Sequence, residues 1–252
     1  MGGSACPTTA AELVLQLLSA LEHLRDNEAA RDQIASALYV PHPSLPRVLS
    51  AVRKLWNKKR RTEVEAKQLG RHMERLASLA FRGLRGWDVL KSYRSPTAQY
   101  DLLVNGSDEY WRAVCSTLRL ASRRRGMLVE VKGTVGEIDN SQFLRLCGTL
   151  HIQFPRTIAI GIFFTLSGAT GFPTLEARQQ HKIGQARLQQ VLFYARHKTP
   201  VVVLTWHDLL KLTAPGSLVR ILSAKIRDIE ELGNPKLGTR TLEEVELPEH
   251  MR

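Results

Sequence analysis

Two short apolar segments that carry charged residues constrain the fold of this chain more than any other feature of its sequence. The first covers residues 99–104 and the second covers residues 127–132, and both are bounded by turn-forming residues. Their length and their branched apolar side chains predict buried strands. A buried strand normally carries no charge, so Asp101, Glu130 and Lys132 require an explanation.

Strand periodicity brings the three charged side chains together. Successive residues of a strand point to opposite faces, so Glu130 and Lys132 share one face while Val129 and Val131 share the other. If the two strands pair, Asp101 lies beside Glu130 on the charged face. Burying these carboxylates is costly unless a cation compensates their charge. Two carboxylates and a backbone carbonyl are oxygen ligands that suit Mg²⁺, and a neighbouring lysine can orient the attacking water.

The order Asp101, Glu130, Lys132 resembles the D…(D/E)xK active site of restriction-endonuclease-like nucleases, the PD-(D/E)xK superfamily. The surroundings resemble its Mrr-like branch. The segment 70–77 is similar to the family's first core helix, and the segment 165–172 is similar to the region after its fourth core strand. The chain differs in having no Pro before the Asp and in a long separation of the two carboxylates, which requires a helical insertion.

This resemblance implies a fold, an activity and a site. The fold is α/β, a restriction-endonuclease-like mixed central sheet flanked by helices. The activity is Mg²⁺-dependent hydrolysis of phosphodiester bonds by an endonuclease, most often of double-stranded DNA, with Mn²⁺ as a substitute for Mg²⁺. Asp101, Glu130 and the Val131 carbonyl would hold the metal, and Lys132 would orient the water. The biological setting would be a restriction system or bacterial and phage defence, with a homodimer for cutting both strands.

A second interpretation stays open, namely a catalytically inactive nuclease fold that only binds nucleic acid or a protein partner. Two further residues are candidates for the catalytic site. Glu74 either reaches the metal or pairs with Arg71 or Arg75. Gln142 lies in the first turn of a predicted helix capped by Asp139, where related nucleases sometimes place a polar residue near the metal.

Basic residues outnumber acidic ones, with 36 Lys and Arg against 24 Asp and Glu, and the formal net charge is +12. This excess favours contact with a phosphate backbone, although an idle basic surface would have the same composition. A basic run around Trp56 and an arginine-rich insertion, expected near the mouth of the site, are the candidates for nucleic-acid binding. Helix-dipole stabilisation and plain solvation are the alternatives. The candidate residues are Arg53, Lys54, Lys58, Lys59, Arg60, Arg61, Arg119, Arg123, Arg124 and Arg125.

The sequence pattern divides the chain into three parts. Residues 1–61 form a small N-terminal helical appendage, with a first amphipathic helix over 10–25, that packs on the main domain or binds a partner protein. Residues 62–232 form the nuclease-like domain, in which a helical insertion over 107–125 separates the two charged strands. Residues 233–252 form an acidic, poorly ordered tail.

Other classes of site and location find no support in the sequence. Cys6, Cys115 and Cys147 are far apart, follow no zinc-ligand spacing and fit a reducing cytosol. The glycine pairs at 133–136 and 168–171 are not followed by the Lys-Ser or Lys-Thr of a phosphate-binding loop. No apolar run approaches membrane length, so we expect a cytoplasmic protein without membrane association.

Overall fold

The computed structural model describes residues 28–94, 99–106, 108–133, 136–170, 172 and 185–233. The predicted helix over 10–25, Cys6 and the predicted tail after residue 233 lie outside these ranges. The described elements, in chain order, are α2 (Glu28–Leu38), α3 (Leu45–Trp56), α4 (Glu63–Arg82), β1 (Trp87–Arg94), β2 (Gln99–Gly106), α5 (Asp108–Leu118), β3 (Gly126–Lys132), α6 (Asn140–Ile152), β4 (Ile158–Thr165), α7 (Gln185–His197), β5 (Val201–Leu204), α8 (Trp206–Leu210), the 3₁₀ helix η2 (Lys211–Thr213) and α9 (Ser217–Gly233).

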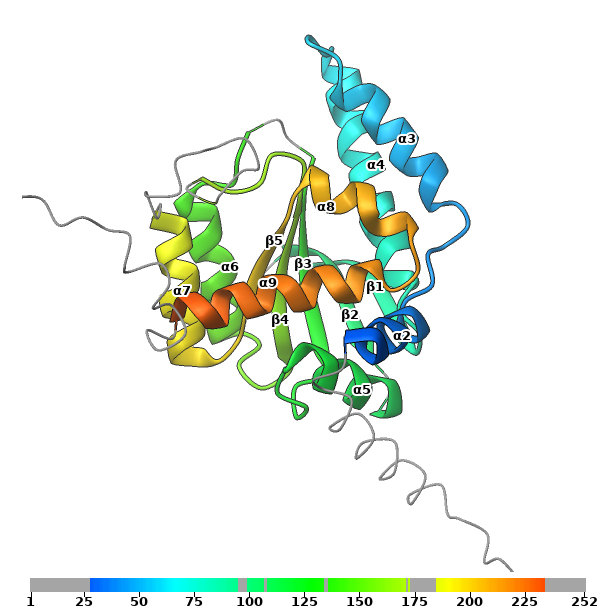
Figure 1. The fold of residues 1–252 in the computed structure, drawn as a ribbon. Helices are drawn as coiled ribbons and strands as arrows, with labels where there is room; N and C mark the ends of the chain where they lie inside the picture. Colours follow the sequence, from blue (N-terminus) through cyan, green and yellow to red (C-terminus); the bar gives the residue numbers. More distant parts are fainter. Residues whose placement is uncertain are drawn as a thin grey trace, which may run out of the picture.

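The strands form one five-stranded mixed sheet in the order β1-β2-β3-β4-β5 (Figure 1). β1, β2 and β3 are antiparallel neighbours, whereas β3, β4 and β5 run parallel. Parallel strands need a crossover connection, and α6 and α7 lie in the two crossovers. The predicted α/β class, with a mixed sheet flanked by helices, is confirmed.

Helices cover both faces of the sheet, and the strand residues alternate between two apolar clusters. Val129 and Phe164 belong to the cluster that includes buried residues of α2, α4, α5 and α9. Leu128 and Phe163 belong to the cluster on the opposite face, which includes residues of α6 and α7. Because side chains alternate along β3, Glu130 points to the same face as Leu128, toward α6.

Helices α4 and α6 begin at capping boxes, and the cap predicted at Asp139 is confirmed. The Thr62 hydroxyl accepts from the Glu65 N–H and the Glu65 carboxylate accepts from the Thr62 N–H at the start of α4. Asp139 and Gln142 form the same reciprocal pair at the start of α6. Each box satisfies backbone donors that the first helical turn leaves without partners, which fixes where the helix begins.

The inserted helix is shorter than predicted. It ends at Leu118 because Arg119 adopts a left-handed backbone conformation, with φ of 55°, and the N–H of Leu120 then donates back to the carbonyl of Cys115. One side of α5 packs into the core, since Trp111, Val114, Cys115 and Leu118 are buried. Ala121, which follows the end of the helix, is exposed.

The described N-terminal helices share the main core. Ala35 and Leu38 of α2 and the buried residues of α3 belong to the cluster that covers the sheet. The Tyr39 hydroxyl donates to the Leu212 carbonyl at 2.7 Å, and Tyr39 forms a β-bridge with Leu84. The border expected at residue 61 is therefore not marked by a break in the core.

The cysteines of α5 and α6 are buried, as predicted. Burial raises the pKa of both the Cys115 and the Cys147 thiol to about 12. The thiolate, which is the form that binds metals and attacks electrophiles, is therefore disfavoured. Within the described ranges no helix has the length and hydropathy needed to cross a bilayer.

Two glycines make the close contact between α4 and the end of β3. A Cβ atom at Gly133 would lie 2.8 Å from the Cα of Gly70, whereas a Cβ at Gly70 would meet no atom within 4 Å. We therefore expect Gly133→Ala to destabilise the fold by about 1–3 kcal/mol through overpacking. Gly70→Ala should stabilise the fold by roughly 0.5–1 kcal/mol, because alanine loses less entropy in a helix. Urea unfolding of both variants tests this, and equal effects would contradict the packing.

Candidate metal site

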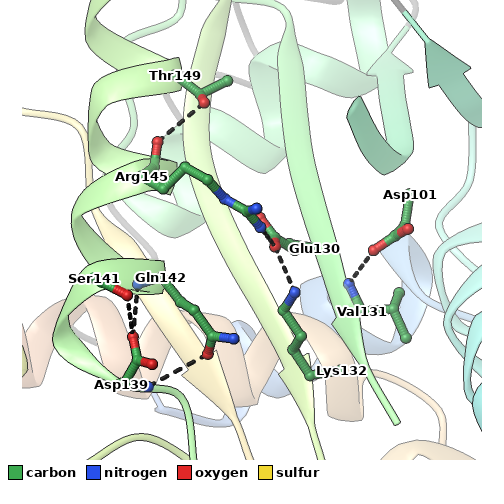
Figure 2. A network of polar contacts seen from close by, with 9 residues as sticks. All are labelled: Asp101, Glu130, Val131, Lys132, Asp139, Ser141, Gln142, Arg145 and Thr149. Atoms are coloured by element: carbon green, nitrogen blue, oxygen red, sulfur yellow. Dashed lines mark hydrogen bonds and ion pairs between the residues drawn. The ribbon is translucent and has the colours of Figure 1, made fainter. Parts of the chain in front are cut away.

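The candidate site lies where β2 begins and β3 ends. The antiparallel ladder between the strands ends at the pair Leu102–Val129. Asp101 and Glu130 are the next opposed residues, and opposed residues share a face. In place of a further backbone pairing, the N–H of Val131 donates to Oδ2 of Asp101 at 2.7 Å (Figure 2). The structure thus brings Asp101 and Glu130 to one end of the sheet, as the sequence pattern predicts.

The Glu130 carboxylate is buried and receives two cations. Its side chain is 8% exposed, and its Oε1 lies 2.8 Å from Nζ of Lys132, which confirms the predicted shared face. The guanidinium of Arg145, from α6, forms an ion pair with the same oxygen (Figure 2). Arg145 was not predicted from the sequence, where its position one turn after Gln142 on α6 is the only signal that could have suggested it.

Asp101 is less well compensated. Burial raises the pKa of its carboxyl group above the ordinary value, and the neighbouring charges of Glu130 and Glu74 raise it further. The hydrogen bond from the Val131 N–H and the charge of Lys132 oppose this shift without cancelling it. The positive charge near an ionised Asp101 is therefore too small to offset its burial and the neighbouring carboxylates, which is the condition a bound cation relieves.

Glu74 is exposed on α4 and acts on the site through its charge. The close contact of Gly70 with Gly133 brings this part of α4 to the end of β3. In the part of the chain that the structure describes, no ion pair joins Glu74 to Arg71 or Arg75. The charge of Glu74 is felt at Asp101 instead, as the raised pKa of Asp101 indicates.

Gln142 has a structural contact. Its Oε1 accepts from the Asp139 N–H at 3.4 Å, and its own N–H donates to the Asp139 carboxylate at 2.8 Å (Figure 2). The Ser141 hydroxyl donates to the same carboxylate. These contacts order the first turn of α6, and the side-chain oxygen of Gln142 is used by the cap.

The oxygen donors at this end of the sheet fit a small hard cation. The N–H and the carbonyl of one strand residue point to the same side, so the Val131 carbonyl faces β2 together with its N–H. Asp101, Glu130 and this carbonyl would offer a cation oxygen donors only, which is the donor type that Mg²⁺ and Mn²⁺ take. Across the described ranges, no group of three His, Cys, Asp or Glu side chains is placed to hold a metal. The set therefore depends on the backbone carbonyl.

The predicted basic run lies at the tip of a helical hairpin formed by α3 and α4, which stands out beyond the sheet (Figure 1). Part of the run has a structural role. Lys58 lies 2.5 Å from Glu65, and Arg61 donates to the last carbonyls of α3 while covering the Trp56 ring. The indole is thus partly covered and less open to base stacking than expected. The remaining cations are exposed, namely Arg53, Lys54, Lys59 and Arg60.

The hairpin and the candidate site share one end of the molecule. The first half of α4, before Gly70, continues past the end of β3 at about 1.5 Å per residue. The exposed cations at the tip therefore stand to one side of Asp101 and Glu130.

The arginine-rich turn after α5 lies at the other end of the sheet, so the expectation that it borders the site is wrong. α5 joins the end of β2 to the start of β3, whereas the site is at the opposite end of both strands, on the order of 13 Å along β3. Arg119 pairs with Glu230 at 3.4 Å, and Arg124 donates to Thr199. A cavity of about 340 Å³ is lined by Trp111, Arg112, Ser122, Arg123 and Arg125.

Known proteins were compared with this chain at three levels. None of the protein-family models, curated proteins or solved structures in these comparisons matches the chain. The contacts and charges around Asp101, Glu130 and Lys132 are therefore the basis for a functional proposal.

The crowding of carboxylates predicts that Asp101→Asn stabilises the metal-free protein. Asparagine keeps an oxygen for the Val131 N–H and removes the repulsion from Glu130 and Glu74. The expected gain at neutral pH is roughly 0.5–1 kcal/mol, since partial exposure screens the charges. Because the folded-state pKa of Asp101 is raised, the parent loses stability as pH rises through that pKa, so the gain should vanish below the ordinary aspartate pKa of 3.8. Urea unfolding at several pH values in EDTA checks this, and a constant difference would contradict it.

Proposed function

We propose that the protein is an endonuclease that hydrolyses phosphodiester bonds of double-stranded DNA with the help of Mg²⁺. The observation that carries the proposal is the meeting of Asp101 and Glu130 on adjacent strand ends, with Lys132 on the same face. The order α4, three antiparallel strands, the α6 crossover and the parallel strand β4 agrees with a restriction-endonuclease-like core. This agreement supports membership of the PD-(D/E)xK superfamily.

The residues at the ends of β2 and β3 have separate roles in the proposed reaction. Asp101, Glu130 and the Val131 carbonyl would hold the cation, which when bound supplies Lewis-acid activation of a water molecule and neutralises charge on the phosphate. Lys132, held near Glu130 by a 2.8 Å ion pair, donates to the water or to a phosphate oxygen as negative charge develops.

The charge distribution supports a nucleic-acid substrate. The exposed cations at the tip of the α3–α4 hairpin lie at the same end of the molecule as the carboxylates. We propose that they hold the DNA backbone beside the site. Cutting both DNA strands takes two active sites, so the active form would be a homodimer. An endonuclease of this kind would serve in restriction or in phage defence.

A binding-only module is the second candidate, and one observation favours it. Glu130 is already neutralised by Lys132 and Arg145, so this buried carboxylate is compensated without a metal. A nuclease-like fold that no longer cleaves would still bind nucleic acid through its basic hairpin.

Cleavage separates the two candidates. Purified protein should nick supercoiled plasmid in Mg²⁺ and should stop in EDTA. Glu130→Gln and Lys132→Ala should each lower the rate by about 10²–10⁴-fold, because they remove a cation ligand and the group that orients the water. Lys211→Ala changes an exposed lysine on η2 and should leave the rate as it is. A plasmid that shifts in a gel without being nicked would establish the binding-only module.

The salt dependence of DNA binding tests the hairpin. The double change Lys59→Ala and Arg60→Ala should weaken binding of a short duplex and reduce the slope of log K against log salt by about 2, as expected for two lost phosphate contacts. Arg123→Ala with Arg125→Ala removes the same charge at the opposite end of the sheet and should change the slope less. Fluorescence anisotropy in Ca²⁺ measures both, and the reverse ranking would place the DNA elsewhere.

A further inference from the structure

Among the residues that the structure describes, Arg145 is a cation that contacts the candidate site from outside the two charged strands. It projects from α6, whose start is fixed by the Asp139–Gln142 capping box, and its guanidinium contacts Oε1 of Glu130 (Figure 2). Its side chain is 62% exposed, compared with 22% for Lys132. The two cations that neutralise Glu130 therefore differ in side-chain mobility. Lys132 is mostly buried at the end of β3, whereas the Arg145 side chain lies mostly in solvent.

Both cations contact the same carboxylate oxygen, which makes them competitors of any metal that Glu130 binds. A divalent cation held by Glu130 and Asp101 would lie close to both side-chain cations, and like charges at such short range repel. Withdrawal of one side chain would relieve this repulsion. Lys132 belongs to the same strand as Glu130, so its position is set by β3, whereas Arg145 has a long side chain that is free to turn into solvent.

We propose that Arg145 is a positioning residue that holds the place of the cation. In the metal-free protein its ion pair orients the buried Glu130 carboxylate. When a divalent cation binds, Arg145 withdraws from Glu130, and its guanidinium then contacts a phosphate oxygen of the substrate. Guanidinium groups bind phosphate with paired hydrogen bonds, so the freed side chain is suited to this contact. This inference rests on the proposed nuclease function.

Cation affinity measured without DNA tests the competition directly. Arg145→Gln should bind Mn²⁺ about two- to tenfold more tightly than the parent in isothermal titration calorimetry, because the substitution removes a positive charge that competes with the metal. The effect is modest because solvent screens the partly exposed guanidinium. The rise in thermal midpoint on adding Mn²⁺ should be larger for the same reason. Arg145→Lys keeps the charge and should bind Mn²⁺ like the parent. Arg156→Gln removes an exposed arginine that precedes β4 and should do the same.

Cleavage supplies the second readout. At saturating Mg²⁺, Arg145→Gln should raise KM for plasmid severalfold with a smaller change in kcat, and Arg145→Lys should restore part of the loss. A purely structural role would instead lower cation affinity and thermal stability together, which would overturn the inference. An Mn²⁺ affinity of Arg145→Gln equal to that of the parent would also overturn the inference. In either case, Mg²⁺-dependent cleavage by the parent protein would still support the proposed function. A parent protein that neither binds Mn²⁺ nor nicks DNA would overturn both.

Discussion

The buried carboxylate of Glu130 is the constraint on which the arrangement of this end of the molecule depends. A carboxylate that is 8% exposed loses most of its hydration, and only nearby positive charge can compensate that loss. Lys132 supplies one charge from the same strand and Arg145 supplies another from α6. The two ion pairs of Glu130 therefore connect the end of β3 with the crossover helix α6.

The end of the β2–β3 ladder provides the second part of this arrangement. Beyond Leu102 and Val129, the Asp101 carboxylate accepts the N–H of Val131. A side chain thus satisfies a backbone donor that a neighbouring strand would normally satisfy, and it brings a second carboxylate to Glu130. α4 adds a third carboxylate, Glu74, and the raised pKa of Asp101 is the electrostatic result. The three carboxylates thus come from three separate elements, β2, β3 and α4.

The distribution of surface charge follows from the topology. α5 connects the ends of β2 and β3 that lie away from Asp101, so its arginine-rich turn is separated from the carboxylates by the length of the strands. The α3–α4 hairpin passes the near end, because Gly70 packs against Gly133. Of the two basic clusters, the hairpin is the one that lies beside the candidate site. Net charge alone could not distinguish them.

The amino-acid sequence determined those features that depend on neighbours along the chain. Alternation along the strands placed Glu130 and Lys132 on one face, and the two capping boxes set the starts of α4 and α6, because these patterns act within a few residues. The end of α5 escaped prediction, since Arg119 rather than glycine adopts the left-handed conformation. The contact of Arg145 with Glu130 and the distance of the arginine turn from the site were decided only by tertiary structure. Both depend on strand register and helix packing, which join residues that no local pattern relates.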